Sequence, residues 1–270
     1  MVEQPILFFD SGVGGLTVLR EMRVLIPEAQ FIYVADDAGF PYGTWEENAL
    51  KERVIKIFRN LLTLYSPGLC IIACNTVSTV MIGILREKFP HILFVGTVPA
   101  IKVAAKKTKS GLISVLATPG TVRCAYTHEL VSSFAEQCHV QLVGSMKLAE
   151  FAESYLRGKP VNSKKVRDEI LPCFVERSGK RTDVIVLACT HYPFLIDLLR
   201  EQALWPVKWI DPAKAVAKYA RSLLPGKICQ QNVVKHKNFA LFTSQNVTLL
   251  TERLLKGFGL DVTKGVDFGL

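Results

Sequence analysis

The sequence predicts an α/β protein with two similar domains, each with a mainly parallel sheet. We expect the domains to be related by pseudo-symmetry, with a site in the cleft between them. Two observations predict this fold. Strand-length apolar runs alternate with amphipathic helical patterns along the whole chain, which is typical of sheets covered by helices on both faces. In addition, two distant parts of the chain carry similar motifs in the same order.

Strands are predicted at short apolar runs bounded by turn or charged residues, because such runs suit strands buried on both faces. They lie at residues 6–9, 31–34, 69–73, 93–95, 112–117, 140–143, 184–188, 207–210 and 240–243. Helices are predicted where apolar residues recur with a period near 3.6. They lie at residues 17–25, 46–65, 77–89, 100–107, 122–137, 163–177, 193–201, 213–223 and 247–256.

The repeated motifs lie at the ends of predicted strands. Residues 69–76 (LCIIACNT) resemble residues 184–191 (VIVLACTH), and residues 7–12 (LFFDSG) resemble residues 115–121 (VLATPGT). In both parts of the chain the two motifs occur in the same order and at nearly the same spacing from each other. This indicates a duplicated α/β unit. We therefore expect residues 1–97 and 211–270 to form one domain and residues 98–210 to form the other.

Length, charge and cysteine content narrow the class of protein. A chain of 270 residues is long enough for two domains. It lacks the amino-terminal pattern of a signal peptide and any apolar stretch of membrane-spanning length. We therefore expect no membrane partner. The seven cysteines are an odd, scattered set, so we expect a reducing, cytoplasmic location.

The net charge of +9 comes largely from residues 208–270. Such a basic segment could attract nucleic acid. However, its basic residues are not interleaved with aromatic residues, and the sequence contains no nucleic-acid-binding motif. We therefore favour a solvated basic surface and expect no nucleic-acid partner.

Polar residues follow four of the predicted strands. They are Asp10-Ser11, Cys74-Asn75-Thr76, residues 118–121 and Cys189-Thr190-His191. Ligands of parallel α/β sheets bind outside the carboxyl ends of the strands. If the two domains face each other, these loops meet in one cleft that contains a thiol from each domain.

Two thiols on opposite walls suit the inversion of a carbon centre by proton transfer, because one face needs a base and the other an acid. Cys74 and Cys189 precede predicted helices, whose N-terminal N–H groups favour a thiolate and a substrate carboxylate. Two nearby anions repel each other, so one thiol should keep its proton. Asp10 and His191 can orient a thiol or relay its proton.

Two other kinds of site use some of the same residues. A zinc site at Cys70, Cys74, Cys189 and His191 is disfavoured, because positions four apart on a strand are about 13 Å apart, too far to share one ion. Residues 12–15 (GVGG) are a weak match to a dinucleotide-binding turn. Asp36 and Asp37 follow at a distance that suits a ribose contact, so this alternative stays open. We expect no cofactor and no metal.

Five motifs together resemble those of the glutamate racemases, cofactor-independent enzymes that make D-glutamate for peptidoglycan. The motifs are residues 9–15 (FDSGVGG), 41–43 (PYG), 73–76 (ACNT), 116–121 (LATPGT) and 189–193 (CTHYP). The resemblance covers about residues 6–213, most of the chain. The related aspartate racemases tend to carry a histidine two positions after the Asn-Thr pair, where this chain has Val77-Ser78.

The resemblance implies that the chain interconverts L- and D-glutamate with no cofactor, and we expect a homodimer. It implies that Cys74 and Cys189 are the two acid/base residues, each deprotonating one enantiomer, and that Asp10 and His191 assist. The implied substrate contacts are Asp10, Ser11, Pro41, Tyr42, Gly43, Asn75, Thr76, Thr118, Thr121 and Thr190. Glu153 matches an acidic residue near the second thiol. Pro119, Phe194 and Pro212 depart from the family pattern, and Phe194 could alter the pocket wall or a regulatory contact.

Overall fold

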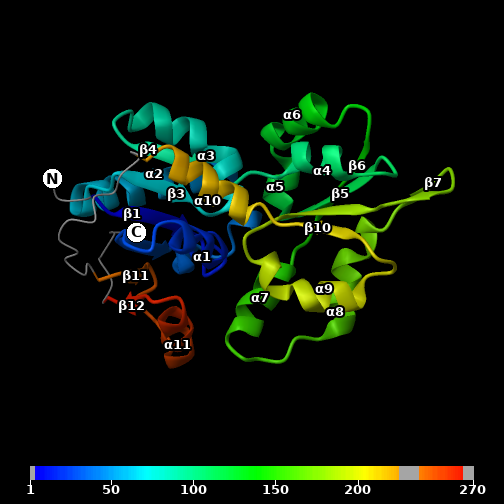
Figure 1. Cartoon of the computed structure of the whole chain (residues 1–270). Coiled ribbons are helices and arrows are strands. Elements are labelled where there is room, and N and C mark those ends of the chain that lie inside the picture. Colours follow the sequence, from blue (N-terminus) through cyan, green and yellow to red (C-terminus); the bar gives the residue numbers. More distant parts are fainter. Residues whose placement is uncertain (1–3, 225–236, 264–270) are drawn as a thin grey trace.

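The computed structural model describes residues 4–224 and 237–263, which form two lobes, each built around its own sheet (Figure 1). The larger sheet has the strand order β12-β11-β2-β1-β3-β4, and all of its neighbouring strands are parallel. Its strands are β1 (Ile6–Asp10), β2 (Phe31–Ala35), β3 (Leu69–Ile72), β4 (Leu93–Gly96), β11 (Phe239–Phe242) and β12 (Asp261–Val262). Strands β1, β2 and β3 are buried along their whole length, which explains their continuous apolar sequences.

The second lobe contains a parallel sheet with the order β10-β9-β5-β6. Its strands are β5 (Leu112–Ala117), β6 (His139–Gly144), β9 (Val184–Ala188) and β10 (Lys208–Ile210). A short antiparallel pair, β7 (Glu176–Arg177) and β8 (Lys180–Arg181), forms a separate exposed hairpin.

The two sheets repeat one topology. The order β2-β1-β3-β4 in the first corresponds to β6-β5-β9-β10 in the second. In each sheet, the strand that follows the central strand (β1 or β5) lies on one side of it (β2 or β6), and the next strand of the sheet (β3 or β9) lies on its other side. This switch point, beside β1 and β5, is where open α/β sheets bind ligands. The prediction of two similar domains with parallel sheets is therefore confirmed.

The helices cover both faces of the sheets, as the alternating sequence pattern predicts (Figure 1). They are α1 (Leu16–Leu25), α2 (Glu47–Tyr65), α3 (Asn75–Lys88), α4 (Ile101–Lys107), α5 (Pro119–Arg123), α6 (Ala125–Phe134), α7 (Leu148–Leu156), α8 (Ser163–Ile170), α9 (Ile196–Gln202), α10 (Ala213–Ser222) and α11 (Leu249–Gly257). Single 3₁₀ turns are η1 (Asp37–Gly39), η2 (Tyr42–Thr44), η3 (Leu171–Cys173) and η4 (Tyr192–Leu195).

Successive side chains of β1 enter different cores. Phe8 packs in a cluster with residues of α1 and α10, whereas Leu7 and Phe9 pack in a cluster with residues of α2 and α3. This is the two-residue period of a strand covered on both sides. Burial on both faces fixes the register of the central strands. The register in turn determines where the polar residues that follow each strand lie along the edge of the sheet.

Two predicted helices differ from the structure, and one helix of the structure was not predicted. The helix predicted over residues 122–137 is broken at Cys124, whose backbone is extended. The helix predicted over residues 163–177 ends at Ile170, because Pro172 follows in η3 and cannot continue an α-helical hydrogen-bond ladder. Helix α7 was not predicted, although its apolar residues Leu148 and Ala152 lie one turn apart on one buried face.

We propose that residues 1–97 and 211–270 form one domain and that residues 98–210 form the other. Strand β10 ends the second sheet at Ile210, after which α10 packs against α1 and β11 pairs with β2. Within these ranges, residues 1–3, 225–236 and 264–270, which include part of the basic carboxyl-terminal segment, lie outside the described part of the chain. No helix in the described part combines the length and apolar character needed to cross a membrane.

Candidate active site

The carboxyl ends of the central strands of both sheets meet at one small cavity. In the first sheet Phe9 is level with Ile72, and in the second Ala117 is level with Ala188. Register therefore places the residues that follow these strands side by side. The cavity is lined by Asp10, Ser11, Phe40, Pro41, Tyr42, Gly43, Cys74, Asn75, Thr76, Thr118, Ala149, Cys189, Thr190 and His191.

Of the residues that the sequence marked as site residues, the structure places all except Thr121 on the cavity wall. Thr121 is fully buried behind that wall, where its hydroxyl lies 3.1 Å from the Thr118 hydroxyl and 3.4 Å from the Thr76 hydroxyl. It contacts two lining residues without itself lining the cavity. Phe40 and Ala149 line the cavity and were not predicted.

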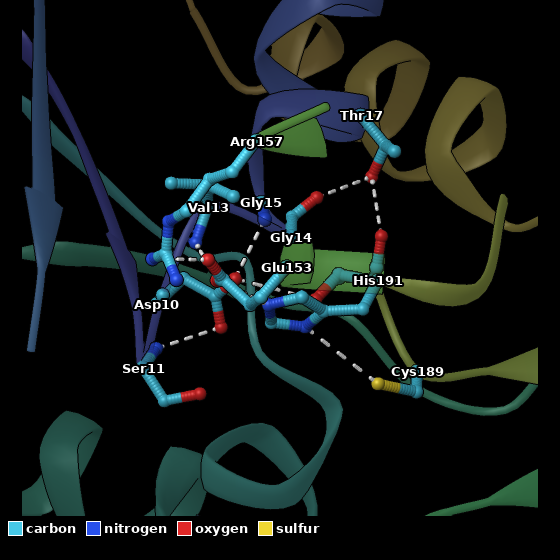
Figure 2. A network of polar contacts seen from close by, with 12 residues as sticks. Asp10, Ser11, Val13, Gly14, Gly15, Thr17, Glu153, Arg157, Cys189 and His191 are labelled. Atoms are coloured by element: carbon cyan, nitrogen blue, oxygen red, sulfur yellow. Dashed lines mark hydrogen bonds and ion pairs between the residues drawn. The ribbon is translucent and has the colours of Figure 1, made fainter. Parts of the chain in front are cut away.

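The Asp10 carboxylate closes the turn between β1 and α1. It accepts hydrogen bonds from the backbone N–H groups of Ser11 (2.8 Å) and Gly15 (2.6 Å), and from the Thr190 hydroxyl (3.3 Å) (Figure 2). Burial raises its pKa from 3.8 to about 6, although the charge of His191 and the backbone hydrogen bonds oppose this rise. The Gly15 N–H already binds this carboxylate, which argues against a pyrophosphate in the glycine-rich turn.

The Cys74 thiol lies at the N-cap position of α3, at the end of β3. The helix N-terminus was expected to favour the thiolate. Instead, burial and the neighbouring charge of Asp10 raise the pKa of Cys74 well above its usual value, and the backbone N–H of Val77 only partly offsets this. Charge on Cys189 raises the pKa of Cys74 further. Cys74 therefore loses its proton less readily than a free thiol, which suits it to act as an acid.

The second thiol lies beside a buried histidine. Nδ1 of His191 is 3.9 Å from Sγ of Cys189, and Nε2 of His191 is 2.9 Å from Oε1 of Glu153 (Figure 2). Burial alone would lower the pKa of His191, but its hydrogen bonds to Cys189 and Glu153 and nearby negative charge raise that pKa well above its usual value. The imidazole is therefore held between a sulfur and a carboxylate, in a position to pass a proton to or from Cys189.

Glu153 holds this histidine from α7. Its Oε1 also accepts a hydrogen bond from the backbone N–H of Val13 (2.9 Å), and its Oε2 pairs with Arg157 (2.7 Å). Burial would raise the pKa of Glu153, but the hydrogen bond and charge of His191, together with Val13 and Arg157, lower it overall. The carboxylate is therefore ionised, and it joins α7 and His191 to the first sheet.

The glycines of the first turn make room for this pair. A Cβ atom on Gly14 would strike the His191 ring and come within 2.7 Å of the Thr190 hydroxyl, and one on Gly12 would strike the Glu153 carboxylate. These positions therefore need glycine because the second lobe packs directly against the turn. A phosphate ligand is not required to explain them.

The side chain of Asn75, on the cavity wall, makes no hydrogen bond within the described part of the chain. It is 2% exposed, and neither its Nδ2 nor its Oδ1 has a hydrogen-bond partner among the described residues. A buried amide without partners is costly unless a ligand or water satisfies it. Asn75 lies in the first turn of α3, so its amide and the first N–H groups of that helix suit an anionic ligand.

Replacing Asp10 by asparagine is expected to remove a pH-dependent penalty on folding. A carboxyl group whose pKa is about 6 when folded, against 3.8 normally, binds its proton more tightly in the folded protein. Its contribution to stability therefore falls between about pH 4 and pH 6, by about 3 kcal/mol in total.

Urea unfolding of the wild type and Asp10→Asn at about pH 4 and about pH 8 measures this effect. The free energy of unfolding of Asp10→Asn minus that of the wild type should be larger at about pH 8 than at about pH 4, by about 3 kcal/mol. An equal difference at both pH values would show that Asp10 does not carry the penalty.

Phe194, which departs from the family pattern, does not line the cavity. Its ring packs edge-on against Phe258, with centroids 6.4 Å apart, beside the core shared by α1 and α10. The expected change in the pocket wall is therefore not found. Phe194 instead joins the turn after Cys189 to the carboxyl-terminal helix.

Comparison with known proteins agrees with this geometry. The model of the Asp/Glu/hydantoin racemase family matches residues 20–220. The chain is 74% identical to the glutamate racemase of Bartonella quintana (strain Toulouse) over 268 residues, 99% of each chain. It is 58% identical to that of Agrobacterium fabrum (strain C58) over 265 residues, 97% of this chain and 96% of the relative.

A crystal structure of Escherichia coli glutamate racemase, in complex with L-glutamate and the activator UDP-MurNAc-Ala, has the same fold. It is 35% identical in sequence, the TM-score is 0.85, and the match covers 96% of this chain and 97% of that one. The chain therefore belongs to the Asp/Glu/hydantoin racemase family and, within it, to the glutamate racemases.

Proposed function

We propose that this protein interconverts L- and D-glutamate by proton transfer between the substrate α-carbon and two cysteine thiols. The observation that carries the proposal is that Cys74 and Cys189, which end strands of two different sheets, line one cavity. A substrate held between them presents opposite faces of its α-carbon to the two sulfurs.

In one direction the thiolate of one cysteine removes the α-proton while the thiol of the other donates a proton to the opposite face. The C–H bond that breaks leaves its electron pair on the α-carbon and carboxylate, and a new C–H bond forms with inverted configuration. The reverse reaction exchanges the two roles. Since the pKa of Cys74 is raised, Cys74 is the acid when Cys189 acts as base, and it must lose its proton before it can act as base in the reverse direction. His191 and Glu153 serve the Cys189 side.

The remaining lining groups suit the charges of an amino acid. Asn75, Thr76 and the N-terminal N–H groups of α3 can donate hydrogen bonds to a carboxylate, where negative charge develops in the reaction. Ser11, Thr118 and Thr190 add hydroxyl groups on the facing walls. We propose that these side chains, with Asp10, Pro41, Tyr42 and Gly43, bind the substrate, and that Thr121 supports Thr118.

Glutamate is favoured over aspartate by the relatives, since the Escherichia coli structure contains L-glutamate. Circular dichroism of L- and D-glutamate, each incubated with purified protein and no added cofactor, tests the proposal. Each enantiomer should lose its signal until the mixture is racemic, and aspartate serves as the control. Racemisation of aspartate alone, or of neither amino acid, would refute the assignment.

We also propose that the protein acts in the cytoplasm as a homodimer. Val24 and Leu249 are 76% and 74% exposed, and covering them with a second copy of the chain would remove their apolar surface from water. Sedimentation equilibrium measures the mass directly, and a monomer at all concentrations would contradict the homodimer.

A further inference from the structure

We propose that Asp36, Arg53 and Thr243 are positioning residues that hold the cavity loop, residues 37–45, in place through Tyr42. None of the three lines the cavity, and the inference rests on the proposed function only for what the loop does to substrate binding. The loop supplies four lining residues in sequence, Phe40, Pro41, Tyr42 and Gly43.

The loop has little regular structure of its own. It consists of the 3₁₀ turns η1 and η2 joined by extended residues. Its tip nevertheless contacts the other lobe, because a Cβ atom on Gly43 would come within 2.7 Å of the Thr118 Cβ. A loop that forms the contact between two lobes needs anchors elsewhere to stay in one conformation.

Asp36, at the end of β2, provides such an anchor. Its carboxylate is fully buried and accepts hydrogen bonds from Tyr42 Oη, from the Arg53 guanidinium and from the Thr243 hydroxyl. Arg53 binds both carboxylate oxygens, at 2.6 and 2.7 Å. Each oxygen therefore has at least two donors, and these hydrogen bonds hold the buried carboxylate in one orientation.

The donors come from three parts of the chain. Arg53 reaches inward from α2, and it lies 5.6 Å from the centre of the Trp45 ring, which contacts Tyr42 edge-on. Thr243 follows β11, where sheet register pairs Phe242 with Ala35 and so brings Thr243 level with Asp36. The Thr243 hydroxyl donates to Asp36 (2.5 Å) and accepts from the Ala38 N–H (3.2 Å).

The packing around Asp36 is close, so the position of its carboxylate determines the position of the neighbouring cavity wall. A Cβ atom on Gly39 would lie 2.8 Å from both Asp36 Oδ2 and Tyr42 Cε1, so no side chain fits between carboxylate and ring. Tyr42 is 2% exposed and reaches the cavity wall. The position of its ring, and of Gly43 beyond it, therefore depends on the carboxylate that Arg53 and Thr243 hold.

The test is Thr243→Val, which keeps the shape of the side chain and removes the hydroxyl. The expected result is a rise in KM of about tenfold for both glutamate enantiomers, with kcat changed less than about threefold, since a lost hydrogen bond to a charged group has about this effect. Hydrogen exchange of residues 37–45, followed by mass spectrometry, should become faster. Thr243→Ser, which keeps the hydroxyl, should restore both values.

A second pair of variants keeps the test valid if Thr243→Val does not fold. Arg53→Lys keeps the charge but loses the two-point contact with Asp36. It should show the same rise in KM and faster exchange, whereas Arg59→Lys, an exposed site on the same helix, should not.

Unchanged KM and unchanged loop exchange in the variants would overturn the inference while leaving racemisation intact. Loss of the serine rescue would also overturn it. Exchange needs no substrate, so it decides the role of the three residues even if the wild type proves not to racemise glutamate.

Discussion

Replacing Cys74 by alanine is expected to abolish racemisation in both directions, with kcat/KM reduced by at least about 10³-fold. Each direction needs both sulfurs, one as base and one as acid. Cys74→Ala should still exchange the α-proton of one enantiomer with solvent, because Cys189 and His191 remain on the other wall. Proton NMR in D₂O measures this exchange for L- and D-glutamate separately.

The opposite variant gives the complementary result. Cys189→Ala should also fail to racemise, and it should exchange the α-proton of the other enantiomer only. Cys138→Ala is the matched control, because this half-buried thiol does not line the cavity, and it should keep wild-type activity. Full racemase activity in both Cys74→Ala and Cys189→Ala would end the two-thiol mechanism.

Replacing His191 by asparagine is expected to lower kcat/KM by about 10²-fold, at the lower end of the effect of an acid/base group. The ring lies between Cys189 and Glu153, so its loss removes the proton relay to the sulfur. The decrease should be the same for both enantiomers, because they have equal free energies in water and the two kcat/KM values must remain equal.

Steady-state kinetics in both directions measures this effect, and the circular dichroism spectrum shows whether the variant is folded. His128→Asn, at an exposed position of α6, is the matched control and should behave as the wild type. Activity of His191→Asn within about twofold of the wild type would show that Cys189 exchanges its proton without the imidazole.

The strand ends could be predicted from the sequence because their signal is local. Apolar runs that end in Asp10, Cys74, Thr118 and Cys189 mark strands of parallel sheets, and parallel sheets bind ligands where such strands end. The repeated order of these motifs also predicted that two similar units supply them. All four residues line the same cavity in the structure.

Other features depend on contacts between distant parts of the chain. Glu153 reaches His191 from α7, a helix absent from the predicted set, and Thr121 is turned away from the cavity toward Thr118. The raised pKa of Cys74 also follows from burial beside Asp10, which no spacing along the chain reveals. The family resemblance placed Glu153 near the second thiol, and the apolar spacing within α7 was the further signal for the helix that carries it.

By itself the sequence determined the two-sheet architecture, the residues at the strand ends and the two thiols, because periodicity and strand termination are properties of short segments. Only the tertiary structure decided the ionisation of the site residues and the contacts that fix their positions. The charges on Asp10, Cys74 and His191 depend on burial and on partners from both lobes. The loop that carries Tyr42 depends likewise on Thr243, about two hundred residues away along the chain. Electrostatic energies and packing depend on distance in space, which the linear sequence does not contain.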